Sequence, residues 1–328
     1  MSGPVLVLVE HLGGEPDRLS LEALAFARGV AADLGAAVEA VLLGSGAPAV
    51  VAGLAGHGVA TAHLATDPRL DAYAPAAWAA VLASLVGGRS PVAIIAAGSE
   101  RGNEILAHLA ARAGLPLAAN VIAAMPGSPW RLVRQRWAGS LLEDSTIDAT
   151  VVLLSVAPHA VAPAEASAGA ATPAVLPVGS SISDADLAVR VVSREAPTAG
   201  GVSLSDARVV VGGGRGVGSA AGFAALEELA GLLGGAVGGS RVVTSLGWRP
   251  HADQIGQTGL RIAPDLYIAC GISGAIQHIV GCKAAKRILA INTDAESPIM
   301  AVADYAVIGD LGTVVPAISA AIRCARGD

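Results

Sequence analysis

Residues 265–292, DLYIACGISGAIQHIVGCKAAKRILAIN, read in order as a strand, a tight turn, a helix and a second strand. We predict the strands at 265–269 and 287–291, and the turn at Gly271 to Gly274. Parallel strands need a crossover connection, and a helix is the usual one. The stretch therefore predicts a parallel βαβ unit and an α/β fold.

The same alternation continues outward on both sides of this unit. Two more strands of the series are predicted at 208–211 and 305–308. The N-terminal half repeats the pattern, with strands at 5–9, 38–43, 92–97 and 150–156 and helices near 20–34, 72–86 and 101–114. Its strands are apolar throughout, as expected when helices cover both faces of a sheet. We therefore predict two Rossmann-like parallel-sheet domains.

The composition changes between the two series. Residues 157–200 are rich in Ala, Pro, Gly and Ser, which is typical of a linker region. We place the domain boundary near residue 200, so that the N-terminal domain spans 1–200 and the C-terminal domain 201–328. A length of 328 residues suits two domains of roughly 150 residues each.

Composition also narrows the possible functions. Hydrophobic residues make up 53% of the chain, yet no apolar stretch is a charge-free run of the roughly 20 residues that cross a bilayer. The net charge of −6 includes no basic block, which argues against a nucleic-acid partner. The three cysteines form no CxxC pair and cannot all be disulfide-bonded, so a reducing, cytoplasmic location is expected.

The turn VVVGGGRGVGS, residues 209–219, joins a strand to a helix through glycines around Arg215. Backbone N–H groups at such a turn suit a phosphate, because glycines let the ligand approach closely. The turn fits neither the dinucleotide nor the Walker A fingerprint, since Ser219 stands where these need glycine or lysine. On this segment alone, a plain glycine turn with a solvated Arg215 is the favoured interpretation.

A second segment is rich in side chains that donate or accept hydrogen bonds. Ser240 and Arg241 follow a glycine pair, and a polar loop after them holds Gln254, Gln257 and Thr258. Guanidinium, amide and hydroxyl groups suit a polar heterocycle or a phosphate. Taken alone, these are also ordinary loop residues.

The turn G-I-S-G-A around Ser273 resembles a nucleophile elbow. That hydrolase fold needs a catalytic histidine well downstream, whereas the last histidine, His278, lies only five residues on. Ser273 is therefore expected to cap the helix or to bind phosphate. Gln277 and His278 lie in the helix that follows, and no HExxH motif or His/Cys cluster predicts a metal.

Polar groups also follow two later strands. Asn292 comes after one of them, and Asp310 with Leu311 after the other. Open α/β sheets bind ligands just past the carboxyl ends of their parallel strands. Asp310 is equally expected as the cap of the final helix.

Taken together, these motifs occur in the order and with the spacing of the alpha subunit of electron-transfer flavoproteins. From Val209 to Pro316 the matching segments are GGRG, GSR, QIGQTG, APDLYIACGISGAIQH, INTD, SPI, ADY and DL-x-x-VVP. The N-terminal half resembles the family more loosely, through VLVLVEH, IIAAGSERGNEILAHLAARAG and RQRWAGS. The family usually has tyrosine and asparagine at the places of Trp137 and Ser140.

The resemblance implies a heterodimer whose alpha subunit binds one FAD in its C-terminal domain. The N-terminal domain, of a nucleotide-hydrolase-like type, would pair with the beta subunit, which often binds AMP. The implied function is to carry electrons from flavoprotein dehydrogenases, as in fatty acid β-oxidation, to a quinone oxidoreductase or another acceptor. Such a protein is an electron carrier with no catalytic residues, and not an enzyme.

The family's flavin contacts carry over onto the matching positions of this chain. The phosphate region would be held by Arg215, Ser240 and Ser273. The ribitol phosphate or adenosine would be contacted by Gln277, Asn292, Asp310 and Leu311. The isoalloxazine ring would be surrounded by Arg241, Gln254, Gln257, Thr258 and His278. Two alternatives remain: an adenine-nucleotide-binding sensor that uses the N-terminal domain, and a serine hydrolase that uses Ser273.

Overall fold

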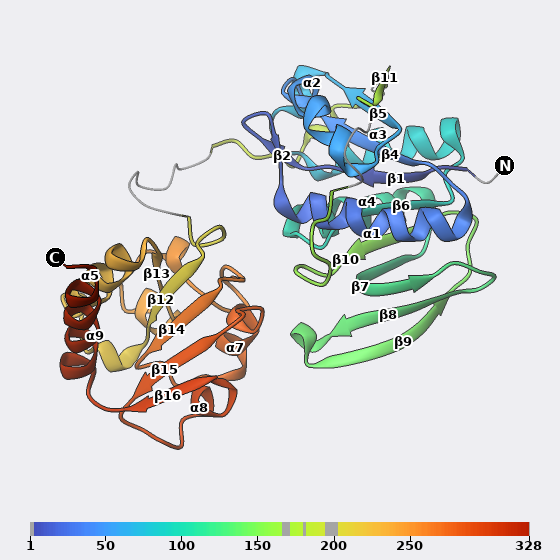
Figure 1. Ribbon diagram of the computed structural model, residues 1–328. Helices are drawn as coiled ribbons and strands as arrows, with labels where there is room; N and C mark the ends of the chain where they lie inside the picture. The colour runs from blue at the N-terminus through green and yellow to red at the C-terminus, as the bar shows by residue number, and fades with distance from the viewer. Residues whose placement is uncertain (1–2, 166–170, 180–181, 194–202, 328) are drawn as a thin grey trace. The chain divides into compact units, whose positions relative to one another are not determined.

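The computed structural model describes residues 3–165, 171–179, 182–193 and 203–327, and it divides into two compact units, Met1–Arg194 and Glu195–Asp328 (Figure 1). Each unit holds one mostly parallel sheet with helices on both faces, which confirms the predicted α/β class. The predicted boundary near residue 200 lies outside the described residues and stays a prediction.

Unit 1 is built on a nine-stranded sheet in the order β11-β5-β4-β1-β6-β10-β7-β8-β9. The strands are β1 Val5–Leu8, β4 Val38–Leu43, β5 Thr61–Ala65, β6 Ala93–Ala97, β7 Leu117–Met125, β8 Trp130–Arg136, β9 Leu141–Ile147, β10 Val152–Val156 and β11 Ala174–Pro177. A small hairpin of β2 His11–Leu12 and β3 Glu15–Pro16 follows β1. The helices are α1 Arg18–Leu34, α2 Ala47–Val50, α3 Pro75–Arg89 and α4 Glu100–Ala113.

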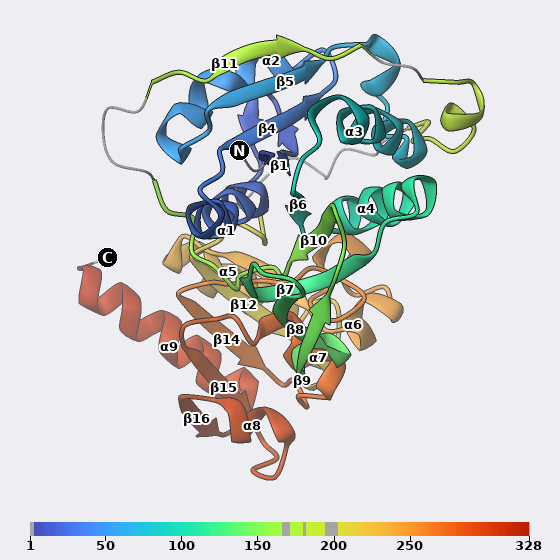
Figure 2. The ribbon, with the colours of Figure 1, turned by 90° about the vertical axis from the view of Figure 1, so that its right-hand side faces the viewer.

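Local sequence explains where the long helices of unit 1 begin and end. The Asp17 carboxylate accepts a hydrogen bond from the Leu19 N–H (2.8 Å) and starts α1, and Gly35 ends that helix with φ +59°. Helix α1 lies on one side of the sheet and α3 and α4 lie on the other (Figure 2). The central strand β1 is therefore buried on both faces, which is why its sequence is apolar throughout.

The sequence pattern did not predict β5, β11 or the strands β7 to β9. Strand β8 pairs antiparallel with both β7 and β9, so these three extend the parallel sheet as a meander. In β8, Trp130 and Leu132 are buried while Arg131 is exposed, which is the alternation of a half-buried strand. Trp137 lies in the turn between β8 and β9 and is 82% exposed.

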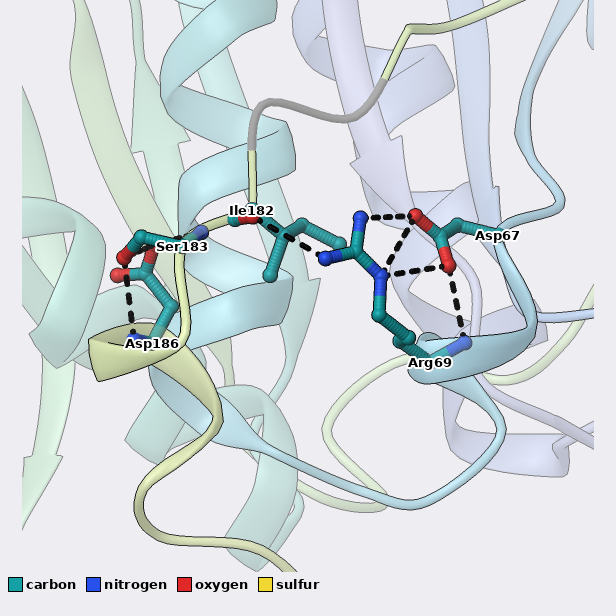
Figure 3. Close-up of polar contacts among 5 residues, drawn as sticks. All are labelled: Asp67, Arg69, Ile182, Ser183 and Asp186. Carbon is teal, nitrogen blue, oxygen red and sulfur yellow. Dashed lines mark hydrogen bonds and ion pairs between the residues drawn. The ribbon is translucent and has the colours of Figure 1, made fainter.

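Part of the predicted linker region belongs to the fold of unit 1. Strand β11 pairs with β5 at the edge of the sheet. After it, the Ile182 carbonyl accepts a hydrogen bond from Nη1 of Arg69 (3.3 Å), and the Asp186 carboxylate accepts one from the Ser183 hydroxyl (2.7 Å) (Figure 3). Asp186 also forms an ion pair with Arg112 of α4 at 2.6 Å. These contacts attach the segment after β11 to unit 1.

Unit 2 has five parallel strands in the order β13-β12-β14-β15-β16. They are β12 Val209–Gly213, β13 Ala236–Gly239, β14 Leu266–Cys270, β15 Ile288–Asn292 and β16 Tyr305–Ile308. Helices α5 Phe223–Leu233 and α9 Leu311–Arg326 cover one face, α7 Ile276–Cys282 and α8 Pro298–Val302 cover the other, and α6 Arg241–Ser245 follows β13 (Figure 1). The four predicted strands are confirmed, and β13 was missed because its sequence, AVGG, is short and half glycine.

We expect Asp186→Ala to destabilise unit 1 by about 1–2 kcal/mol, because hydrogen bonds to a charged group contribute roughly 1.5–3 kcal/mol and the exposure of Arg112 weakens this pair. Arg112 and Ser183 lower the pKa of Asp186 to about 2. The stabilisation is therefore present above about pH 4 and is lost as the pH falls toward 2. Urea unfolding followed by circular dichroism should show a larger effect of the substitution at pH 7 than at pH 3.

The exposed neighbour Asp184 provides the control, since its side chain makes no capping hydrogen bond. Asp184→Ala should change the free energy of unfolding by no more than about 0.5 kcal/mol. Equal losses in the two variants, or a loss at Asp186 that does not depend on pH, would contradict the assigned role.

Candidate functional site

A cavity of about 880 Å³ lies in unit 2 where four strands reach their carboxyl ends. Gly214, Ser240 and Gly271 directly follow β12, β13 and β14, and Asn292 is the last residue of β15. Open α/β sheets bind ligands at this edge. Ten of the twelve predicted site residues line the cavity: Arg215, Ser240, Arg241, Gln254, Gln257, Thr258, Ser273, Gln277, His278 and Asn292.

The turn after β12 and the turn after β14 contact each other backbone to backbone. Gly214 donates its N–H to the Cys270 carbonyl (2.8 Å), and Gly216 donates to the Gly271 carbonyl (3.1 Å). A Cβ at Gly214 would lie 2.3 Å from the Gly271 oxygen, and Gly271 itself has φ +61°. Only glycine fits at positions 214 and 271. The two turns therefore pack directly against each other, and both border the cavity.

Two arginines give the cavity a positive charge. Arg215 opens the short helix η5 (Arg215–Val217) after β12, and Arg241 opens α6 after Ser240. Both are exposed, and neither forms an ion pair with a residue that the structure describes. The lining includes one carboxylate, Asp294, which accepts a hydrogen bond from the Glu296 N–H (3.0 Å). Two guanidinium groups against one carboxylate favour an anionic ligand such as a phosphate.

A buried amide connects two hydroxyl groups along the cavity wall. The Thr244 hydroxyl donates to Oε1 of Gln254 (2.9 Å), and Nε2 of Gln254 donates to the Thr258 hydroxyl (3.0 Å). Gln254 is 5% exposed, so its surroundings hold the amide in this orientation. Because the Thr258 oxygen already accepts from Gln254, its own O–H is left to donate to a ligand.

Two further hydrogen bonds join the loops that surround the cavity. The Gln257 N–H donates to the Gln277 carbonyl (2.7 Å), which connects the loop before β14 to helix α7. Nδ2 of Asn292 donates to the Ile272 carbonyl (3.0 Å), which connects the end of β15 to the turn after β14. Asn292 therefore has a structural role in addition to its place in the lining.

Ser273 does not cap helix α7, which follows Ala275 and has no side-chain cap. No residue in the described part of the chain forms a hydrogen bond with its hydroxyl group. The downstream histidine, His278, pairs its Nε2 with the Tyr267 hydroxyl (2.8 Å) and not with Ser273. The described residues therefore do not form the Ser–His pair that a serine hydrolase needs.

His278 lies on α7 in the wall of the cavity and is 7% exposed. Burial lowers the pKa of His278 to about 4, and a hydrogen bond with the Ile255 backbone opposes this shift more weakly. The ring is therefore neutral near pH 7 and carries a single N–H. Its Nδ1 is buried and forms no hydrogen bond of good geometry with the described residues.

Asp310 and Leu311 do not line the cavity. Asp310 caps helix α9 by accepting a hydrogen bond from the Gly312 N–H (2.8 Å), which was the alternative interpretation of this residue. Leu311 places its Cδ1 2.9 Å from the position that a Cβ of Gly271 would take, so it contacts the glycine turn that borders the cavity.

The structure adds lining residues that were not among the predicted site residues. Most contribute backbone, small or apolar groups: Gly214, Gly216, Val242, Ser245, Leu246, Ile255, Gly256, Gly271, Ile272, Ala275, Asp294 and Ser297. All lie within or beside the segments that carried the predicted residues. A criterion based on strong side-chain donors passes over them, whereas their closeness to the glycine turns was the available signal.

The described part of the chain gives little support for a metal site, a membrane-spanning helix or a reactive thiolate. Within it, no three or more histidine, cysteine, aspartate or glutamate side chains are grouped so that they could hold a metal ion. No helix there combines the length and the apolar character needed to cross a membrane. Cys270 and Cys282 are buried, and burial raises the pKa of each thiol to about 12, so neither is a reactive thiolate at neutral pH.

Residues 5–180 match the family model of the electron transfer flavoprotein domain, and residues 203–283 match that of the electron transfer flavoprotein FAD-binding domain. The electron transfer flavoprotein subunit alpha of Mycobacterium tuberculosis (strain CDC 1551 / Oshkosh) is 39% identical over 323 residues, which cover 98% of this chain and 99% of that protein. The same subunit of Bacillus subtilis (strain 168) is 34% identical over 320 residues, 97% of each chain. Protein FixB of Clostridium saccharobutylicum is 35% identical and covers 96% of this chain and 95% of its own. The resemblance seen in the motifs is thus confirmed, and the chain belongs to the electron transfer flavoprotein alpha-subunit family.

Proposed function

We propose that this chain carries electrons through an FAD bound in the cavity of unit 2, as the alpha subunit of a heterodimer. One observation carries the proposal: two guanidinium groups, unpaired among the described residues, line the same cavity as eight other residues that were predicted to contact FAD. The FAD-binding domain of the family, residues 203–283, includes most of this lining. The comparisons support neither the nucleotide sensor nor the serine hydrolase.

The residues present fit FAD in charge and in hydrogen-bonding capacity. Arg215 suits a phosphate, while Arg241 and the free O–H of Thr258 suit acceptor atoms of the isoalloxazine ring. A volume of about 880 Å³ lies within the range of cofactor sites, roughly 300–1,000 Å³. Bound FAD would supply one- and two-electron transfer, and its ring gains negative charge on reduction.

We divide the site residues among the parts of the cofactor. Arg215, Ser240 and Ser273 hold the phosphate region, because a charged donor and two hydroxyl groups suit it. Arg241 stays protonated at any working pH, so it offsets negative charge on the ring without titrating. The other ring contacts are Gln254, Gln257, Thr258 and His278. The ribitol phosphate or adenosine is assigned to Gln277 and Asn292 and, beyond the cavity wall, to Asp310 and Leu311.

The family membership supports a beta subunit as partner, and we assign the pairing to unit 1. We propose flavoprotein dehydrogenases, including those of fatty acid β-oxidation, as electron donors and a quinone oxidoreductase as acceptor. In this function the chain is a carrier that acts between proteins, without a substrate of its own. A cytoplasmic location is supported by its three free cysteines, of which Cys270 and Cys282 are buried and Cys324 is exposed.

Arg215→Ala should weaken FAD binding about tenfold, because a charge-assisted phosphate contact contributes roughly 1.5–3 kcal/mol and exposure places Arg215 at the lower end. The midpoint potential of the bound FAD should change little, since the phosphates are not reduced. Titration of the FAD-free heterodimer with FAD, followed by flavin fluorescence, measures the affinity. Arg326→Ala removes an exposed arginine outside the cavity lining and should bind FAD normally. Equal losses in both variants would exclude a specific phosphate contact.

Arg241→Ala should lower the midpoint potential of the bound FAD, because the guanidinium attracts the ring more strongly as the ring gains charge. A tenfold loss of this preference corresponds to about 59 mV for one electron. Arg241→Lys keeps the charge but loses the planar fork of donors, so it should give a smaller shift. Spectroelectrochemical titration at matched FAD occupancy measures both, and an unchanged potential in Arg241→Ala would show that this residue does not contact the ring.

Expression of this chain alone should give poor yield or weak FAD retention, and co-expression with its beta subunit should restore both. The reason is that the family's alpha subunit is half of a heterodimer. Size-exclusion chromatography with absorbance at flavin wavelengths measures assembly and FAD content together. A monodisperse, fully flavinated monomer with normal electron transfer would disprove the requirement for a partner.

A further inference from the structure

A buried tyrosine contacts the buried histidine of the cavity wall. Tyr267 lies on β14 with no exposed surface, and His278 lies on α7, which covers the same face of the sheet. The Tyr267 hydroxyl is 2.8 Å from Nε2 of His278. The two rings are tilted by 33°, with their centroids 6.1 Å apart. None of the flavin contacts assigned above includes Tyr267.

The space around this hydroxyl group leaves little room for rearrangement. A Cβ at Gly212, on the neighbouring strand β12, would lie 2.3 Å from the Tyr267 hydroxyl oxygen. Glycine at position 212 therefore makes the room that the phenol occupies. The hydroxyl forms its hydrogen bond to Nε2 of His278, and no other described residue is bonded to it.

The positions of the protons follow from this geometry. Burial raises the pKa of Tyr267 well above its usual value, so the phenol keeps its proton. A buried O–H needs an acceptor, and Nε2 of His278 is the one within reach. An Nε2 that accepts a hydrogen bond carries no proton, so the single N–H of the neutral ring lies at Nδ1. Nδ1 is buried and forms no hydrogen bond of good geometry with any residue that the structure describes.

We propose that Tyr267 is a positioning residue: its O–H donates to Nε2 of His278, fixes the Nδ1–H tautomer and holds the ring in its place in the cavity wall. This inference rests on the proposed binding of FAD in the same cavity. Without the phenol, the ring can also adopt the Nε2–H tautomer and present a lone pair at Nδ1. The ring also loses the hydrogen bond that holds it in the cavity wall, where the cofactor is proposed to lie.

The first test needs no substitution at Tyr267. Nitrogen-15 NMR of the full chain with its beta subunit, recorded with and without FAD, distinguishes protonated from unprotonated ring nitrogens. His278→Gln identifies the His278 signals by their disappearance. We expect a proton on Nδ1 and none on Nε2 in both states, and a proton on Nε2 in the wild-type protein overturns the proposal.

The second test removes the hydroxyl group and keeps the ring. In Tyr267→Phe, the His278 ring should show the Nε2–H tautomer, FAD should bind roughly 2- to 10-fold more weakly, and its midpoint potential should fall. Tyr305→Phe removes a hydroxyl from a residue of unit 2 that is 61% exposed and lies outside the cavity lining, and it should change none of the three readouts.

The outcomes separate this inference from the function on which it rests. Wild-type FAD affinity and potential in Tyr267→Phe overturn the positioning role, whatever the tautomer. A wild-type heterodimer that binds no FAD overturns the proposed function, while the tautomer measured without FAD still tests the Tyr267–His278 bond. If Tyr267→Phe does not fold, the wild-type spectrum decides the assignment of the proton.

Discussion

The backbone contact between the turns after β12 and β14 is the constraint on which the cavity depends. Gly214 and Gly271 approach so closely that a Cβ on either would overlap backbone atoms of the other turn. Arg215 follows one side of this contact and Ser273 lies just beyond the other, so the spacing of the glycines sets the spacing of these side chains. A larger residue in either turn would separate the two strands, because a packed interior does not yield by several ångströms.

The cavity combines exposed positive charge with a buried, uncharged wall. Arg215 and Arg241 keep contact with solvent, so their charges avoid most of the cost of desolvation. Tyr267 and His278 are buried, and burial disfavours the ionised form of each, so both take part as neutral hydrogen-bonding groups. Hydrogen bonds in such surroundings are stronger than in water. This arrangement suits a cofactor that combines permanently charged phosphates with a ring whose charge changes.

Much of the fold could be predicted from sequence, because parallel strands covered on both faces are apolar throughout. The predicted strands at 38–43 and 305–308 have the bounds of β4 and β16. Strands β7 to β9 do not show such a run: Asn120 interrupts β7, and β8 and β9 are rich in charged and polar residues. Strand β11 was missed for another reason: it lies in a Pro-rich stretch, and its pairing partner, β5, is more than a hundred residues away in the chain.

By itself, the sequence determined the succession of strands, turns and helices and the polar residues that follow the strand ends, since these depend on neighbours a few residues apart. It also carried the motifs of the family. The tertiary structure decided which of those residues share one cavity. It assigned Asp310 to the cap of α9, joined Gln254 to Thr258 and Thr244, and placed Tyr267 against His278. Hydrogen bonds between separate elements form only when the packing of the sheet and its helices brings donor and acceptor within reach, and no local pattern encodes that distance.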